Sequence, residues 1–269
     1  MSLLKDKLFN SLKDLKENYN IIGVKSEFET EGATFEEAQT LKELASSLNL
    51  EFTLKIGGCG AIKDLYDAKK LGADNIVAPM IESEYALKKY IEGVGVGVNG
   101  VNVGIISPEN YQIKKYINIE TTTGYENLDK IINSPYFNKI DGVVFGRSDF
   151  AESIHLNKDE VNSARILDVA KEISQKMKLY NKDFIIGGNV TAESVEFFKQ
   201  ILNTKFETRK IIFDSSSVNN PEIQTGIIKS LEFEILWLKY KQEKFNNLSN
   251  EDLKRIKSLE TNCKALIQM

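Results

Sequence analysis

Two acidic side chains follow apolar runs that are close together in the sequence. Glu120 closes the run 115–120, and Asp149 lies just past the run 142–146. Both runs have the length and apolar content of buried strands, and adjacent parallel strands lie about 4.8 Å apart, so carboxylates at neighbouring strand ends can bind one cation. Hard divalent ions such as Mg²⁺ prefer carboxylate oxygens and keep waters that a substrate can displace. The pair therefore predicts a metal-dependent active site.

The composition is ordinary for a globular protein and excludes several classes of partner. The chain has 269 residues, of which 42% are hydrophobic and 28% charged, with a formal net charge of −4. Lys and Arg do not gather in a basic patch, so we expect no nucleic-acid partner. No apolar stretch approaches the roughly 20 residues that cross a bilayer, so we also expect no membrane partner.

Two features of the sequence favour a cytoplasmic location. The N-terminus mixes charges into its apolar positions and lacks the hydrophobic core of a secretion signal. Cys59 and Cys263 are the only cysteines and lie far apart, which argues against a disulfide scaffold or a structural zinc site and is typical of a reducing compartment.

Apolar runs of strand length alternate with amphipathic segments of helix length, a pattern that predicts a parallel sheet with helical crossovers. The expected strands cover 21–28, 52–56, 75–80, 115–120, 142–146, 184–188 and 210–214, with an eighth candidate at 101–106. We therefore expect an α/β fold, a TIM (β/α)8 barrel, in a single domain 1–269. A doubly wound sheet is the alternative.

Helical segments flank the expected barrel core, which spans 20–220. Apolar residues recur at helical spacing in 3–18, so we expect an N-terminal helix within 1–19. The segment 221–269 also has a helical pattern and forms a C-terminal extension. This extension either packs on a neighbouring subunit or caps its own barrel, and its length favours a homo-oligomer.

A glycine-rich run contains a formal GxGxxG match at Gly95, Gly97 and Gly100. A dinucleotide site of this type needs a strand before the glycines and a helix after them. Here an expected helix precedes the run, and the strand candidate 101–106 follows it. We expect a connector rather than a nucleotide-binding loop.

Three segments, in this order and at these spacings, resemble one enzyme family. They are VAPMIES at 77–83, NIET at 118–121 and GVVFGRSDF at 142–150. The chain resembles the HpcH/HpaI aldolase and citrate lyase β-subunit family, within the phosphoenolpyruvate/pyruvate barrel superfamily, from about residue 21 to residue 214. The resemblance implies a barrel whose site lies at the C-terminal ends of its strands, where TIM-barrel chemistry generally occurs.

The resemblance also implies roles for particular residues. Glu120 and Asp149 match the family's two metal-binding carboxylates, so the expected cofactor is Mg²⁺ or Mn²⁺. The metal in this family chelates the carboxylate and 2-oxo oxygens of a pyruvate-like fragment and stabilises the enolate that carbon–carbon cleavage leaves. Backbone N–H groups of the turn from Gly146 to Ser148 would hold the substrate carboxylate. Arg147 would either bind substrate or pair with a loop carboxylate.

The sequence departs from the family at two positions. The aldolases place an arginine on the strand equivalent to 52–56, where this chain has Lys55. Lysine keeps the charge but loses the planar two-pronged donor, so we expect Lys55 to stabilise the enolate oxygen, with Schiff-base chemistry as the alternative. The aldolases' histidine after an early strand is also absent here, so Glu27 or Glu29 is the expected base. The only histidine, His155, is expected at the surface.

Two further polar residues are candidate substrate contacts at the same end of the barrel. Asn189 follows the expected strand 184–188, and Ser215 follows the expected strand 210–214. Both residues lie just beyond a strand end, where barrel active sites are built.

The sequence thus predicts a metal-dependent carbon–carbon lyase of the aldolase or citrate lyase type, acting on a 2-oxo acid or a related small-molecule carboxylate. Two alternatives stay open. One is an acyl-CoA lyase or a phosphoenolpyruvate-using enzyme of the same superfamily. The other is a catalytically silent barrel that binds a metabolite, which the missing histidine favours and the retained carboxylate pair opposes.

Overall fold

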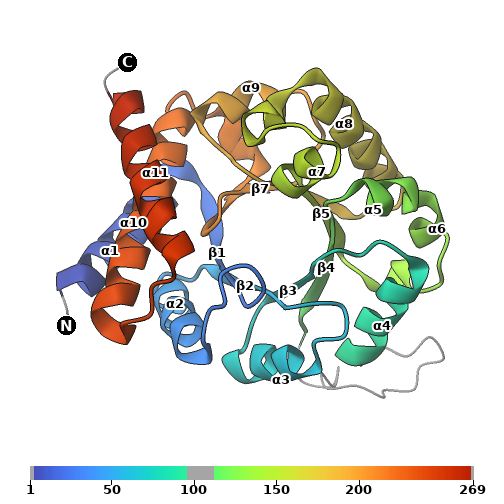
Figure 1. The fold of residues 1–269 in the computed structure, drawn as a ribbon, viewed down its shortest axis with the longest axis horizontal. Coiled ribbons are helices and arrows are strands. Elements are labelled where there is room, and N and C mark those ends of the chain that lie inside the picture. The colour runs from blue at the N-terminus through green and yellow to red at the C-terminus, as the bar shows by residue number, and fades with distance from the viewer. Residues whose placement is uncertain (1–2, 96–111, 268–269) are drawn as a thin grey trace.

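Strands from along the described chain close into a barrel surrounded by helices (Figure 1). The structure is a computed structural model that describes residues 3–95 and 112–267. Strands β1 to β8 follow one another around the barrel in sequence order and cover Ile21–Glu27, Glu51–Lys55, Asn75–Ala78, Lys114–Ile119, Gly142–Gly146, Asp183–Gly187, Lys205–Glu207 and Ile211–Asp214. The expected TIM-type α/β barrel is confirmed. The strand candidate at 101–106 lies outside the described residues.

Helices connect the strands along the outside of the barrel (Figure 1). The α-helices between the strands are α2 (Phe35–Ser47), α3 (Ile62–Leu71), α4 (Glu84–Val94), α5 (Thr122–Glu126), α6 (Leu128–Ile132), α7 (Arg147–Ser153), α8 (Ala164–Leu179) and α9 (Val195–Phe198). Short 3₁₀ helices add η1 (Phe137–Lys139), η2 (Lys158–Asn162), η3 (Ala192–Ser194) and η4 (Ser215–Asn219).

Local sequence explains where several helices begin and end. Thr34 begins α2 with a capping box, in which its hydroxyl accepts from the Glu37 N–H while the Glu37 carboxylate accepts from the Thr34 N–H. Ser83 caps the start of α4 with its hydroxyl, which accepts a hydrogen bond from the Ala86 N–H. Gly72 ends α3 in a left-handed conformation, φ 65°, which glycine adopts without strain.

The eighth strand runs opposite to the other seven. Strands β1 to β7 pair in parallel, whereas β8 is antiparallel to both β7 and β1. Only residues 208–210 join β7 to β8, and a parallel crossover needs a dozen or more residues. The sequence-based expectation is therefore corrected here: the run 210–214 is an antiparallel strand, and β7 was not expected.

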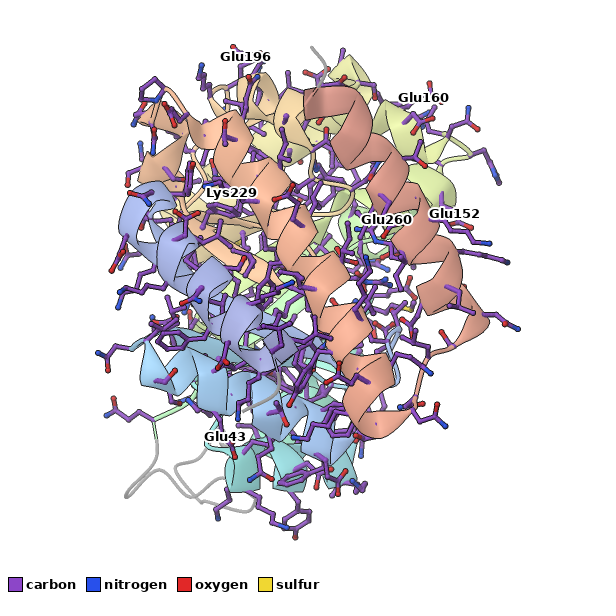
Figure 2. The ribbon with its side chains drawn as sticks, turned by 90° about the vertical axis from the view of Figure 1, so that its left-hand side faces the viewer. Glu43, Glu152, Glu160, Glu196, Lys229 and Glu260 are labelled. Atoms are coloured by element: carbon purple, nitrogen blue, oxygen red, sulfur yellow. The ribbon has the colours of Figure 1, made fainter. Side chains whose placement is uncertain are left out.

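Three helices cover one side of the barrel (Figure 2). They are α1 (Leu3–Tyr19), α10 (Ile223–Phe245) and α11 (Asn250–Ile267). Helix α1 packs on α10, where Gly226 makes room for the Tyr19 ring: a Cβ on Gly226 would lie 2.5 Å from a ring carbon of Tyr19. The Lys229 ammonium, labelled in Figure 2, binds the Asp14 carboxylate of α1 at 2.7 Å.

The C-terminal extension packs on its own chain. Leu259 of α11 packs against Leu231 and Ile235 of α10, and α10 in turn packs on α1. The extension thus contacts its own chain, and packing on a neighbouring subunit stays a prediction. Among the helices described, none is long and apolar enough to span a bilayer.

The barrel interior has a thin apolar layer. Val77, Tyr116, Val144 and Ile185 form a small buried cluster of their own, contributed by β3, β4, β5 and β6. The larger hydrophobic core lies between the strands and the surrounding helices. Buried charged side chains lie beyond this layer, toward the end where the parallel strands finish, and include Lys25, Glu27, Lys55 and Glu120.

Candidate active site

Charged side chains from several strands converge at the end of the barrel where β1 to β7 finish, which we call the mouth. Glu27 ends β1, Lys55 ends β2, Glu120 follows β4, and Asp149 lies in the first turn of α7, directly after β5. Because C-terminal ends of parallel strands meet at one end of a barrel, residues far apart in the sequence come together here, as the sequence predicted.

Glu120 is held rigidly at the mouth. Its side chain is only 2% exposed. Oε1 accepts a hydrogen bond from the Met80 N–H at 2.9 Å, and Oε2 accepts one from Asn118 Nδ2 at 2.6 Å. Met80 has φ 47°, an uncommon conformation for a residue with a side chain, and strain of this kind persists where the surrounding structure holds it, often at functional sites.

Asp149 shares the space of Glu120. The pKa of Asp149 is raised to about 6. The main cause is desolvation at the mouth, and the second is the negative charge of Glu120. The two carboxyl groups also share a hydrogen bond, which favours the protonated form of Asp149. Gly146 permits this arrangement, because a Cβ at that position would lie 2.9 Å from both Cβ and Oε2 of Glu120.

The donor set fits a divalent cation that keeps open coordination positions. Burial, and after it the charge of Glu120, raises the pKa of Asp149, and a cation between the two carboxylates would favour their ionised forms. Among the residues that the structure describes, no group of three or more His, Cys, Asp or Glu side chains could enclose a metal. Glu120 and Asp149 are two carboxylates that could hold such an ion together with water and substrate, since Mg²⁺ often uses one or two protein carboxylates.

Lys55 lies beside this pair as a buried cation. Its Nζ is 2.8 Å from Glu29 Oε2 and 3.5 Å from Glu120 Oε2. Burial alone would lower the pKa of Lys55, but the charges of Glu120 and Glu27 outweigh it and raise the pKa above its ordinary value. A Schiff base needs the neutral amine, so the structure favours the electrostatic role over imine chemistry.

The two expected bases differ sharply in their surroundings. Glu27 Oε1 lies 3.0 Å from Lys25 Nζ. Burial would raise the pKa of Glu27, but Lys25 and Lys55 lower it to about 2, and so weak a base is a poor proton acceptor near neutral pH. Glu29 contacts Lys55, and its charge contributes to the raised pKa of Asp149. Glu29 is therefore the better placed of the two.

The structure corrects the expected role of Arg147. Its side chain is fully buried, and its guanidinium donates to the Gly187 and Gly188 carbonyls at 3.0 and 2.9 Å and to Asn162 Oδ1 at 2.6 Å. It also lies over the Phe197 ring. With these donors committed to the barrel wall, Arg147 neither binds substrate nor pairs with a loop carboxylate.

The remaining substrate contacts are placed as follows. Gly188, with φ 83°, lets the end of β6 lie against the start of α7, because a Cβ there would meet the Ser148 nitrogen at 2.5 Å. Asn189 comes next and is exposed beyond the strand end. Substrate binding by Asn189 and by the backbone from Gly146 to Ser148 stays a prediction.

Ser215 and His155 do not belong to the mouth. Because β8 is antiparallel, Ser215 lies at the opposite end of the barrel, where the Asp214 N–H donates to the carbonyl of Asn20 at 3.2 Å. The expectation that Ser215 contacts substrate is therefore wrong. His155 is exposed after α7, as expected.

Three further side chains lie at the mouth: Lys25, which the sequence offered as a partner of the expected base, and Glu207 and Asn118, for which it predicted no role. Lys25 Nζ lies 2.5 Å from Glu207 Oε1 as well as near Glu27, so it bridges β1 and β7. Asn118 positions Glu120, and its own Oδ1 is buried without a hydrogen-bond partner among the described residues. Lys25 lies two residues before Glu27 and therefore on the same face of β1. Strand β7 is too short to show a pattern that would identify Glu207.

A family model agrees with this geometry. The model of the HpcH/HpaI aldolase/citrate lyase family matches residues 58–221, a range that contains Glu120 and Asp149. No protein with a curated description matches the chain by sequence.

Solved structures share the fold at low sequence identity. The HpcH/HpaI aldolase from Desulfitobacterium hafniense DCB-2 is similar with a TM-score of 0.61 and 12% identity, over 79% of this chain and 84% of that one. An HpcH/HpaI aldolase/citrate lyase family protein from Burkholderia cenocepacia J2315 gives 0.61 and 14%, over 77% and 85%. The citrate synthase SbnG gives 0.58 and 14%, over 88% and 91%.

Proposed function

Because this chain belongs to the HpcH/HpaI aldolase/citrate lyase family, which indicates a lyase-type function, we propose that it is a divalent-metal-dependent carbon–carbon lyase. Its substrate is a 2-oxo acid or a related carboxylate, and the reaction passes through a stabilised enolate. The observation that supports this proposal most strongly is the close pair of Glu120 and Asp149 beside the Lys55 ammonium.

Two carboxylates of the mouth are the proposed metal ligands. Glu120 and Asp149 would hold Mg²⁺ or Mn²⁺ at the mouth. When bound, the ion supplies Lewis-acid stabilisation of negative charge on the substrate's 2-oxo oxygen.

The other charged residues of the mouth handle the enolate and the proton. With a 4-hydroxy-2-oxo acid, the Glu29 carboxylate takes the hydroxyl proton while the bond between C3 and C4 breaks, an aldehyde leaves, and the bonding electrons form the enolate. The Lys55 ammonium faces the developing negative charge from its place between Glu29 and Glu120. Glu29 then returns the proton to C3.

The test is proton NMR of methyl exchange in pyruvate dissolved in D₂O, with the purified protein and Mg²⁺ or Mn²⁺. We expect exchange that EDTA abolishes and that Glu120→Gln and Asp149→Asn slow by about 100-fold or more. The matched control is Asp214→Asn, since Asp214 ends β8 at the opposite end of the barrel and should leave the exchange rate unchanged.

Electron paramagnetic resonance of Mn²⁺ separates binding from turnover. Mn²⁺ binding without exchange in pyruvate, but with exchange in another 2-oxo acid or an acyl thioester, would replace pyruvate as the substrate unit. Mn²⁺ binding without exchange in any of them would contradict the lyase proposal and indicate a silent, metabolite-binding barrel.

A further inference from the structure

The turn between β7 and β8 brings two cations to the mouth. Because β8 runs antiparallel, it begins where the parallel strands end, and the Lys25 N–H donates to the Lys210 carbonyl at 2.9 Å. A parallel eighth strand would have placed its first residues at the opposite end. Arg209 and Lys210 therefore reach the mouth as a direct consequence of the hairpin.

Both cations bind the carboxylate of Glu31, which lies on the loop that follows β1. Lys210 Nζ forms an ion pair and hydrogen bond with Glu31 Oε2, and Arg209 Nε lies 3.4 Å from Glu31 Oε1. Lys210 is only 2% exposed. A buried ammonium is stable only when it is paired, so the Lys210 contact holds Glu31 Oε2, while Glu31 Oε1 has the Arg209 charge nearby but no hydrogen-bond partner among the described residues.

The loop that carries Glu31 is short and closed on itself. It leaves β1 after Glu27 and returns at Ala33, whose N–H donates to the Glu27 carbonyl at 3.2 Å. Gly32 makes the turn with φ 54°. Glu29 lies two positions before Glu31 on this loop, and its carboxylate reaches Lys55 Nζ at 2.8 Å. Any movement of Glu31 is therefore passed to Glu29 through very few backbone bonds.

Ion pairs with the C-terminal helices hold Arg209 in place. Arg209 Nη1 lies 3.9 Å from Glu234 Oε1 of α10. Arg255 of α11 binds the same carboxylate with two prongs, at 2.8 and 2.9 Å. Arg209 is thus held on one side by Glu31 and on the other by Glu234, which limits its freedom to release the loop.

We propose that Glu31, Arg209 and Lys210 form a clamp that positions the loop after β1 and thereby holds Glu29 against Lys55. These three are positioning residues, since none of them contacts the Glu120–Asp149 pair. The role of Glu29 as base rests on the proposed function, whereas the position of the loop does not. The hairpin of β7 and β8 then contributes to the site, because it supplies Arg209 and Lys210.

The competing explanation is that these ion pairs only fasten the C-terminal helices. A second buried pair does that and reaches the loop only at its last residue: Lys241 of α10 lies 3.2 Å from Asp252 Oδ2 and 3.9 Å from Glu37 Oε2, which accepts a hydrogen bond from the Thr34 N–H. Lys241 is 5% exposed, close to the burial of Lys210. Lys241→Met is therefore the matched control for Lys210→Met.

The test combines hydrogen–deuterium exchange of residues 28–33 with the rate of metal-dependent pyruvate exchange. In Lys210→Met and in the gentler Glu31→Gln, we expect amide exchange in this loop to rise about tenfold or more. We expect the kcat for pyruvate exchange to fall about tenfold with little change in KM, because substrate binding is untouched while the base is displaced. Lys210→Arg should restore both, and Lys241→Met should change neither.

Two results would overturn the inference. One is unchanged loop exchange in both Lys210→Met and Glu31→Gln. The other is an equal effect of Lys241→Met on the loop and on turnover, because the pairs would then act only through the helices. If the unmodified protein shows no metal-dependent exchange at all, the proposed function fails, and the amide exchange of the loop still decides whether the clamp exists.

Discussion

Replacing Gly146 with alanine should displace the most rigidly held carboxylate of the mouth. The new Cβ would lie 2.9 Å from both Cβ and Oε2 of Glu120, about 0.5 Å closer than the ordinary van der Waals range that begins at 3.4 Å. Glu120 cannot retreat freely, because the Met80 N–H and Asn118 hold its two oxygens at 2.9 and 2.6 Å. Either these hydrogen bonds lengthen or β4 and β5 separate.

The size of the effect follows from that overlap. Overpacking a filled interior costs about 1–3 kcal/mol of unfolding free energy. For a chain of this size that corresponds to a Tm lower by roughly 2–12 °C. A misplacement of about 1 Å at a catalytic group costs on the order of 100-fold in rate, so a shift of about half that distance should slow pyruvate exchange about tenfold.

The neighbouring strand provides a matched control. Gly187 pairs with Gly146 in register and also faces a glutamate, but a Cβ there would lie 3.2 Å from Cγ and Oε1 of Glu207. Gly187→Ala should therefore lower the Tm by less than half as much and leave Mn²⁺ affinity unchanged. Thermal unfolding, Mn²⁺ resonance and pyruvate exchange together measure the contrast. A Gly146→Ala protein with unchanged Tm and Mn²⁺ affinity would refute the reasoning.

Two further predictions concern Arg147 and Asp149. Arg147→Lys cannot reach both glycine carbonyls and Asn162 at once, so it should destabilise the fold by about 1–3 kcal/mol with no change in substrate KM; a raised KM at constant Tm would mean that Arg147 binds substrate after all. Mn²⁺ affinity should fall as the pH drops through about 6, because Asp149 then takes up a proton. Glu120→Gln removes the repulsion that raises this pKa, so direct ¹³C NMR titration of the Asp149 carboxyl should give a lower midpoint, and an unmoved midpoint would leave desolvation as the whole cause.

The strands that sequence reasoning located well are those that are buried on both faces. The strands β1 to β6 have apolar sequences because helices cover them outside and side chains fill the barrel inside. Their expected bounds differ from the observed ones by at most one residue, except at the end of β3, which lies two residues earlier than expected. Strand β7 has three residues, Lys205 to Glu207, of which only one is apolar, so it offers no periodicity. An apolar run does not reveal in which direction its strand will lie in the sheet. The antiparallel direction of β8 follows from the short connection 208–210, which could be identified only once β7 was known.

The site was predictable where it depends on strand ends and unpredictable where it depends on side-chain direction. Glu120, Lys55 and Glu29 come together because their strands end at the same mouth. Arg147 starts a helix and turns into the wall toward carbonyls that lie 40 residues further along the chain, which no local pattern reveals. The contrast between Glu27 and Glu29 likewise required the position of Lys25.

The contact between the two ends of the described chain determines when this protein can finish folding. Strand β1 pairs with β8, and α1 packs on α10, so the partners of these early segments are synthesised much later than the segments themselves. At about 5–20 residues per second, the interval between Tyr19 and its partner Gly226 is on the order of 10–40 s. During that time the apolar face of α1 and one edge of β1 remain uncovered on the ribosome, and an open strand edge is a template for wrong pairing. Barrel closure is thus a late, long-range event, of the kind that slows folding and exposes a nascent chain to aggregation.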